Sequence, residues 1–141
     1  MKRTATAEWK GDLKAGKGAI STASGVLKGT QYSFSTRFEN GIGTNPEELL
    51  AAAHAGCFTM ALSAQLGAAG LTADSLETTC AITLDKVGDS FEITESHLDL
   101  KARVPGATRE QFDTAVGNAK SGCPVSKLYK TKITLTSTLE E

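Results

Sequence analysis

Two cysteine motifs are the part of this sequence most able to carry out chemistry. Cys57 follows the uncharged run Ala-His-Ala-Gly, and Cys123 begins the motif Cys-Pro-Val-Ser-Lys. Two thiols in such separate and strongly marked contexts indicate redox chemistry, because a thiolate is a nucleophile and the first step of a ladder of oxidised sulfur states. Cys80 alternates with Ile82 and Leu84, so we expect it to be a core residue.

The sequence predicts different environments for the two thiols. Cys57 lies deep in an uncharged helix, where burial raises a thiol's pKa and the helix dipole gives no compensation. Taken alone, Cys57 is best interpreted as a small core residue. Cys123 precedes Pro124 at a helix start, where amide groups and the dipole lower a thiol's pKa. Residue chemistry alone therefore makes Cys123 the better nucleophile.

Three further residues are candidate partners for a reactive thiol. Arg37, at the end of the third predicted strand, offers a cation, although a lone arginine there is otherwise a solvated charge. His54 lies one helical turn before Cys57 and could form a Cys-His pair, but a packed or solvent-touching histidine is the simpler interpretation. A zinc site of His54, Cys57 and Cys123 lacks the usual Cys-x-x-Cys or His-x-x-x-His spacing, so we expect no metal.

Glu47 is the third candidate, and its availability depends on where the long helix begins. If Thr44 were the cap, Glu47 would be used in a capping box. Pro46 favours the first helical position, which makes Asn45 the cap and leaves Glu47 free. On a straight helix Glu47 and Cys57 are about 15 Å apart along the axis, beyond direct contact. Either an arginine bridges this gap or the carboxylate comes from a second chain.

The first half of the chain predicts strands followed by one long helix. Alternating residues separated by glycines indicate antiparallel strands at about 3–10, 17–24 and 29–39. A loop at 40–43 precedes a helix that starts at Asn45-Pro46 and ends near Ala69, before Gly70.

The second half predicts a hairpin, two helices and a closing strand. Apolar residues alternate with polar ones on both sides of the Gly88-Asp89 turn, which predicts two strands. After the turn they change from odd-numbered to even-numbered positions, which predicts a bulge near Ser96 or His97. Thr108 and Gln111 form a capping box for a second helix, Cys123-Pro124 starts a short third one, and residues 132–138 form a strand. This order predicts a single α+β domain over residues 1–141.

Composition and charge limit the classes of partner and the cellular location that we expect. Fifteen basic against sixteen acidic residues give a net charge of −1, with no basic block, so nucleic acid is not expected as a partner. Three cysteines are too few for a disulfide scaffold, and the polar start is unlike a signal peptide, which predicts a cytoplasmic protein. Residues 49–69 carry no charge but include polar side chains, so we expect a buried helix and no membrane span.

The two cysteine motifs, together with Arg37 and the Asn-Pro-Glu step at Glu47, resemble the OsmC/Ohr peroxidases over nearly the whole chain, and the OsmC branch more than the Ohr branch. The resemblance implies an OsmC-like fold, with antiparallel sheets and a long central helix in an intertwined homodimer. It also implies an active site at the dimer interface, where Arg37 and Glu47 match the family's arginine and glutamate.

By the same resemblance, Cys57 is the peroxidatic cysteine and Cys123 the resolving one. The Cys57 thiolate would reduce an organic hydroperoxide to an alcohol, and hydrogen peroxide less well. The resulting sulfenic acid would then form a Cys57–Cys123 disulfide. No bound cofactor is implied, and an external dithiol, such as a lipoyl group, would reset the enzyme. The alternative is a non-catalytic small-molecule-binding or structural α+β protein whose cysteines only pack.

Overall fold

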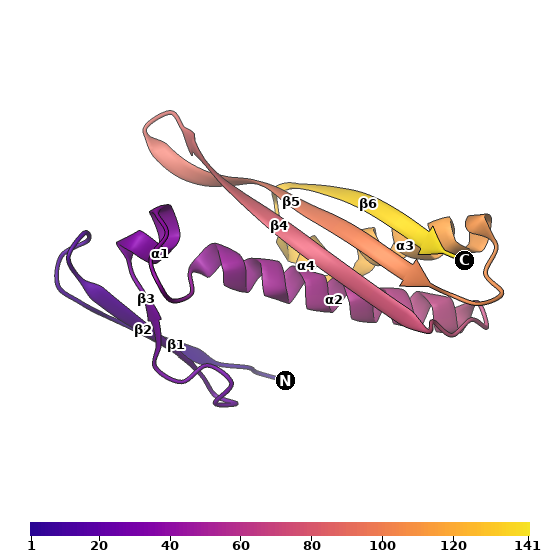
Figure 1. Ribbon diagram of the computed structural model, residues 1–141, viewed down its shortest axis with the longest axis horizontal. Coiled ribbons are helices and arrows are strands. Elements are labelled where there is room, and N and C mark those ends of the chain that lie inside the picture. Colours follow the sequence, from indigo (N-terminus) through magenta and orange to yellow (C-terminus); the bar gives the residue numbers. More distant parts are fainter. The chain divides into compact units, whose positions relative to one another are not determined.

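The computed structural model describes residues 1–141, which divide into two compact units, residues 1–49 and 50–141 (Figure 1). The first unit contains the strands β1 (Ala5–Lys10), β2 (Lys17–Thr22) and β3 (Thr30–Tyr32) and the helix α1 (Phe34–Phe38). The second contains β4 (Ser75–Val87), β5 (Ser90–Arg103), α3 (Arg109–Gly122), α4 (Pro124–Leu128) and β6 (Lys132–Glu140). The long helix α2 (Pro46–Ala68) starts in the first unit and continues in the second. The expected α+β class is confirmed.

The first unit is built on an antiparallel sheet in the order β1-β2-β3. Trp9 and Tyr32 both pair with Gly18 in register, and their rings lie 5.5 Å apart. A Cβ on Gly18 would come within 2.3 Å of the Tyr32 ring, so only glycine allows this close approach.

The predicted third strand, 29–39, is wrong beyond Tyr32, because residues 34–38 form helix α1. The cause is a capping box. The Ser33 hydroxyl accepts the Thr36 N–H, and the Thr36 hydroxyl accepts the Ser33 N–H. Phe34 and Phe38 then stack one turn apart, with centroids 4.9 Å apart. Arg37 therefore lies in the last turn of a helix and not at the end of a strand.

Helix α2 begins as expected. The Asn45 side-chain oxygen accepts the Glu48 N–H at 2.8 Å, with Pro46 at the first helical position. Asn45 is thus the cap, and Glu47 is left free for another partner. The helix ends before Gly70, whose φ of +76° is typical of glycine after a helix.

The second unit contains a sheet in the order β4-β5-β6. β4 and β5 form the expected hairpin, but β5 and β6 are parallel, which corrects the expectation of antiparallel sheets. Parallel neighbours need a crossover, and α3 and α4 provide it. The bulge lies at Thr94, where the register shifts opposite Thr83 and Leu84, a little before the predicted Ser96 or His97.

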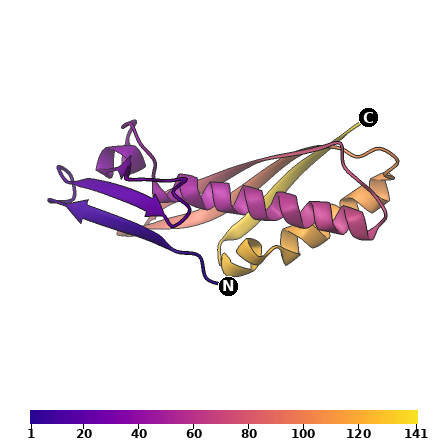
Figure 2. The same ribbon diagram turned by 90° about the horizontal axis from the view of Figure 1, so that it is seen from below.

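The core of the second unit lies where α2 and α3 pack on one face of this sheet (Figure 2). Alternate β5 residues and one stripe of each helix supply its largest fully buried apolar side chains: Phe58, Leu62, Leu66, Leu98, Leu100 and Phe112. This matches the predicted β5 alternation.

The expectation that α2 is buried holds for one face only. His54, Phe58, Leu62 and Leu66 are buried, whereas Met60 is 78% exposed. By length and composition α2 could cross a membrane, a test that the core helix of a soluble protein also passes. Its outer face is apolar but uncovered.

Candidate active site

The structure brings the two predicted thiols together within the second unit. Cys57 lies on α2, and Cys123 lies between α3 and α4. All three cysteines are free, and Cys123 lies close enough to Cys57 to raise the pKa of the Cys57 thiol. Cys57 is half-buried, whereas Cys123 has no exposed surface. The pair is therefore a dithiol with one accessible and one hidden sulfur.

The environment of Cys57 affects its pKa in both directions. Burial raises the pKa most, and the hydrogen bond and the charge of Cys123 raise it further, while a hydrogen bond from the Val125 backbone lowers it. The expected rise from burial is thus confirmed.

Cys123 caps helix α4, as the sequence predicts. Its sulfur accepts the Ser126 N–H at 3.4 Å and lies 3.1 Å from the Ser126 hydroxyl. Pro124 follows at the first helical position. The cap fixes the direction of the sulfur at the start of this short helix.

His54 is a packed histidine, in line with the simpler expectation. It is fully buried, with Nδ1 2.6 Å from the Ser96 hydroxyl and Nε2 2.8 Å from the Ser126 hydroxyl. The Tyr129 ring meets it edge-on at 5.0 Å between centroids. Burial lowers the His54 pKa, which favours the neutral imidazole. Its hydrogen bonds go to two hydroxyls, so the Cys-His pair with Cys57 does not form.

Sequence reasoning missed the two serines beside His54. Ser126 could have been found as the third residue of the helix that Cys123 caps, the position whose N–H meets a cap. Ser96 could have been found as a polar residue on the inward face of β5, in line with Leu98 and Leu100. Nothing in the sequence links either serine to His54.

Arg37 and Glu47 form an ion pair in the first unit. The Arg37 Nε donates to Glu47 Oε1 at 3.0 Å and Nη2 donates to the same oxygen at 2.7 Å. The Glu47 side chain is 11% exposed and that of Arg37 40%. Glu47 holds the guanidinium in place while leaving Nη1 outside the pair. The structure therefore brings these two candidate residues together, while their part in a reaction stays a prediction.

A cavity of about 260 Å³ lies beside Arg37 in the first unit. Aromatic and apolar side chains supply most of its wall, which is made by Trp9, Leu13, Tyr32, Ser33, Phe34, Arg37, Phe38 and Pro46. A single guanidinium among such residues suits a ligand with an apolar body and an oxygen-bearing head.

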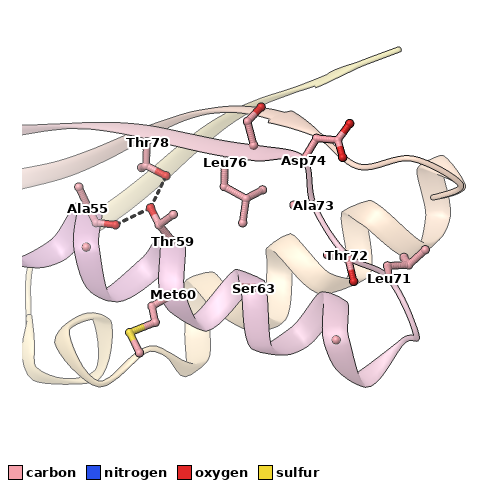
Figure 3. Close-up of a pocket in the computed structure, with 13 residues that line it drawn as sticks. Ala55, Thr59, Met60, Ser63, Leu71, Thr72, Ala73, Asp74, Leu76 and Thr78 are labelled. Atoms are coloured by element: carbon pink, nitrogen blue, oxygen red, sulfur yellow. Dashed lines mark hydrogen bonds between the residues drawn. The ribbon is translucent and has the colours of Figure 1, made fainter.

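A second cavity, of about 740 Å³, runs along the uncovered face of α2 in the second unit (Figure 3). Met60 and Ser63 face it from the helix, and the segment from Leu71 to Thr78 forms its other side. The Thr59 hydroxyl donates to Thr78 at 2.7 Å across its inner end. No cysteine lines this cavity, so we assign it no catalytic role.

Comparison with known proteins gives consistent matches. A family model described as OsmC-like protein matches residues 38–138. The peroxiredoxin OsmC of Escherichia coli (strain K12) is 54% identical over 129 residues, which cover 92% of this chain and 90% of that protein. An organic hydroperoxide resistance protein of Xanthomonas axonopodis pv. citri (strain 306) is 31% identical over 105 residues, 70% of this chain and 68% of that protein. The crystal structure of the Bacillus subtilis organic hydroperoxide resistance protein OhrB has a TM-score of 0.64 at 26% identity, covering 97% of this chain and 98% of that one.

Proposed function

Because the chain belongs to the OsmC-like protein family, we propose that it is a thiol-dependent peroxidase in which Cys57 reduces organic hydroperoxides and Cys123 resolves the product. The observation that carries the proposal is the proximity of two free thiols of unequal exposure. The curated names of its relatives support the same class of activity.

Exposure supports the order of the two thiols. A hydroperoxide needs access to the attacking sulfur, and Cys123 has no exposed surface, whereas Cys57 is half-buried. This favours Cys57 as the first nucleophile, although the helix start at Cys123 alone would favour the reverse. The Cys57 thiolate attacks a peroxide oxygen and becomes a sulfenic acid, and the leaving alkoxide takes a proton to become an alcohol. The Cys123 sulfur then displaces water from that sulfenic acid to form a disulfide.

Arg37 and Glu47 are proposed as the electrostatic part of the site. Arg37 keeps its charge and can stabilise a thiolate and a peroxide oxygen, and Glu47 orients it through the hydrogen bonds at Nε and Nη2.

The proposed substrate is an organic hydroperoxide with an apolar tail. The aromatic cavity beside Arg37 supports this, since it combines an apolar wall with one cationic group. Of the apolar residues that follow Cys57 in sequence, Phe58 is buried in the core and Met60 is exposed to solvent. Neighbours of Cys57 in sequence therefore do not by themselves identify the substrate pocket. An external dithiol, such as a lipoyl group or a small thiol, is proposed to reduce the disulfide, and a cytoplasmic location stays a prediction.

A homodimer is part of the proposal. The outer face of α2 is apolar, carries no charged residue after Glu48, and includes the exposed Gly56, Met60, Ser63 and Gly67. A second copy of the chain would cover this surface.

The decisive experiment treats the reduced protein with one equivalent of cumene hydroperoxide and follows its thiols by titration and mass spectrometry. Cys57→Ser should leave the peroxide unreduced, whereas Cys123→Ser should react once and stop as a sulfenic acid or a more oxidised form. Cys80→Ser is the matched control and should still form the disulfide.

Two outcomes would contradict the proposal. Single-turnover activity in Cys57→Ser but not in Cys123→Ser would exchange the roles of the two thiols. Unchanged thiols in the wild-type protein would support the alternative, a binding or structural protein whose cysteines only pack.

A further inference from the structure

A continuous buried chain of hydrogen bonds starts at Cys123 and passes through His54. The Cys123 sulfur lies 3.1 Å from the Ser126 hydroxyl, which lies 2.8 Å from His54 Nε2. On the other side of the ring, Nδ1 lies 2.6 Å from the Ser96 hydroxyl, which lies 3.3 Å from the Cys80 sulfur. Four elements, α2, α4, β4 and β5, together with the α3–α4 junction, bring these five groups together.

This series of hydrogen bonds is shielded from water and could carry a proton. His54, Ser96 and Cys123 have no exposed surface, and Ser126 is 7% exposed. A neutral imidazole has one donor and one acceptor nitrogen. In the tautomer with its hydrogen on Nδ1, Nδ1–H donates to Ser96 and Nε2 accepts from Ser126, and this is the form in which Nε2 can take up a proton. The Ser126 oxygen is thereby left to accept the S–H of Cys123.

The resolving step needs such a path for a proton. When the Cys123 sulfur attacks the sulfenic sulfur of Cys57, its S–H bond breaks, the S–S bond forms and the hydroxyl group leaves. The released proton and the hydroxide together make one water molecule. Bulk water cannot take this proton directly, since Cys123 has no exposed surface. A base within reach of the thiol would remove the difficulty.

We propose that Ser126 and His54 form a proton relay that activates Cys123 in the resolving step. Ser126 contacts the reacting sulfur and is a catalytic residue, whereas His54 acts through it and is a positioning residue. The relay takes the thiol proton during the attack and returns it to the leaving hydroxide. The inference rests on the proposed roles of Cys57 and Cys123.

The groups around the ring suit this role. Its titratable neighbours are Cys57 and Cys123, Cys80 beyond Ser96, and Tyr129, whose hydroxyl donates to the Leu50 carbonyl at 2.9 Å. Burial alone lowers the His54 pKa, with no contribution from a charged side chain. The imidazole therefore stays neutral, and able to accept a proton, as the pH falls through 6.5, the ordinary histidine value.

The test replaces His54 by glutamine, which can keep hydrogen bonds to both serines but cannot take up a proton. After one equivalent of cumene hydroperoxide, dimedone trapping measures the Cys57 sulfenic acid and quenched mass spectrometry measures the disulfide. In His54→Gln we expect sulfenic acid to form at the wild-type rate and the disulfide to form about ten to a hundred times more slowly. Cys57 should then over-oxidise more readily.

The pH profile separates a relay from a structural role. Wild-type disulfide formation should stay level as the pH falls through 6.5 and decline only in more acidic solution, because protonated His54 cannot accept a proton. In His54→Gln the disulfide should form at a rate that rises steadily with pH, about tenfold per unit, because hydroxide that reaches the thiol only during transient openings of the site must then remove the proton. A level profile at the wild-type rate in this variant would overturn the relay.

His97→Gln is the matched control. His97 also lies between two hydroxyls, with Nδ1 2.6 Å from Thr134 and Nε2 3.3 Å from Thr136, but it has no thiol partner. The His97→Gln variant should form the Cys57–Cys123 disulfide at the wild-type rate. Ser126→Ala should form the disulfide as slowly as His54→Gln, and it serves as the test if His54→Gln does not fold. Disulfide formation at the wild-type rate in Ser126→Ala would also overturn the relay. If the wild-type protein forms no sulfenic acid, the proposed function fails instead.

Discussion

At the scale of single residues, we propose that two pairs of side chains, one in each unit, have different tasks in the reaction. Cys57 and Cys123 are the proposed redox pair, and their unequal exposure favours Cys57 as the first to react. Arg37 and Glu47 supply an oriented charge, with the carboxylate more buried than the guanidinium. The planar fork of arginine makes this pair a directional device and not only a positive charge.

We therefore expect Arg37→Lys to impair peroxide reduction although it keeps the charge. The lysine ammonium carries its three donors on a single nitrogen, so it cannot bind Glu47 through two nitrogens of a planar fork and direct a third nitrogen at a peroxide oxygen. We expect kcat/KM for cumene hydroperoxide to fall about tenfold or more. The ion pair is partly exposed, so the free energy of unfolding should change by only about 1 kcal/mol. Steady-state kinetics and urea unfolding measure the two effects.

Arg103→Lys is the control for this substitution. Arg103 pairs with Glu140 at 3.2 Å on the surface of the second unit, with half of its side chain exposed. The Arg103→Lys variant should have the same kcat/KM as the wild-type protein. Equal kcat/KM in Arg37→Lys and the wild type would show that the fork geometry at Arg37 has no part in the reaction.

At the scale of elements, helix starts decide where the reactive groups lie. Asn45 caps α2, and its side-chain amide also donates to the Thr36 carbonyl of α1 at 2.9 Å. It thus ties the helix that carries Glu47 to the helix that carries Arg37. Thr108 caps α3 in a comparable way, because its hydroxyl accepts the Gln111 N–H at 3.1 Å. This cap is far in sequence from Arg37 and Glu47.

Asn45→Ala and Thr108→Ala should each lower the free energy of unfolding by about 1 kcal/mol, the usual effect of losing a helix cap. Only Asn45→Ala should also lower kcat/KM, because it loosens the Arg37–Glu47 pair. Urea unfolding and peroxidase kinetics on both variants test this. Equal activity in the two would mean that the cap acts on stability alone.

The elements also show what the sequence can and cannot predict. The α2 and α3 starts, the β4–β5 hairpin and the freedom of Glu47 follow from short local signals, and the structure has them. Helix α1 was missed because the alternating aromatics from Tyr32 to Phe38 also fit a strand, and the local cap at Ser33 decided otherwise. The parallel β6 and the serines beside His54 depend on contacts between distant segments, which strand and helix periodicity do not encode.

At the scale of the whole molecule, the uncovered face of α2 is the feature that most needs a partner. It borders the cavity of about 740 Å³ along Leu71–Thr78, and Met60 on this face is 78% exposed. A Cβ added at Gly56 or Gly67 would meet nothing within 4 Å in the chain, so these glycines are not required by packing inside it. Close approach of a second helix is a role that glycines of this kind can fill.

Met60→Glu should convert the proposed dimer to monomers, because it would place an unpaired carboxylate in an apolar interface. Light scattering at micromolar concentration measures the change. Val26→Glu, at a site that is 85% exposed in the first unit, should leave the dimer intact. A wild-type protein that is already monomeric would remove the dimer from the proposal.

The parallel pairing of β5 with β6 has a consequence for the order in which the chain matures. Cys123 lies on the crossover between these two strands, so the pairing of β6 with β5 fixes both ends of the segment that carries it. Such long-range pairings form late in folding. A newly made chain therefore carries an accessible Cys57 before it has a resolving partner. During that interval it is exposed to the oxidant that the mature protein removes.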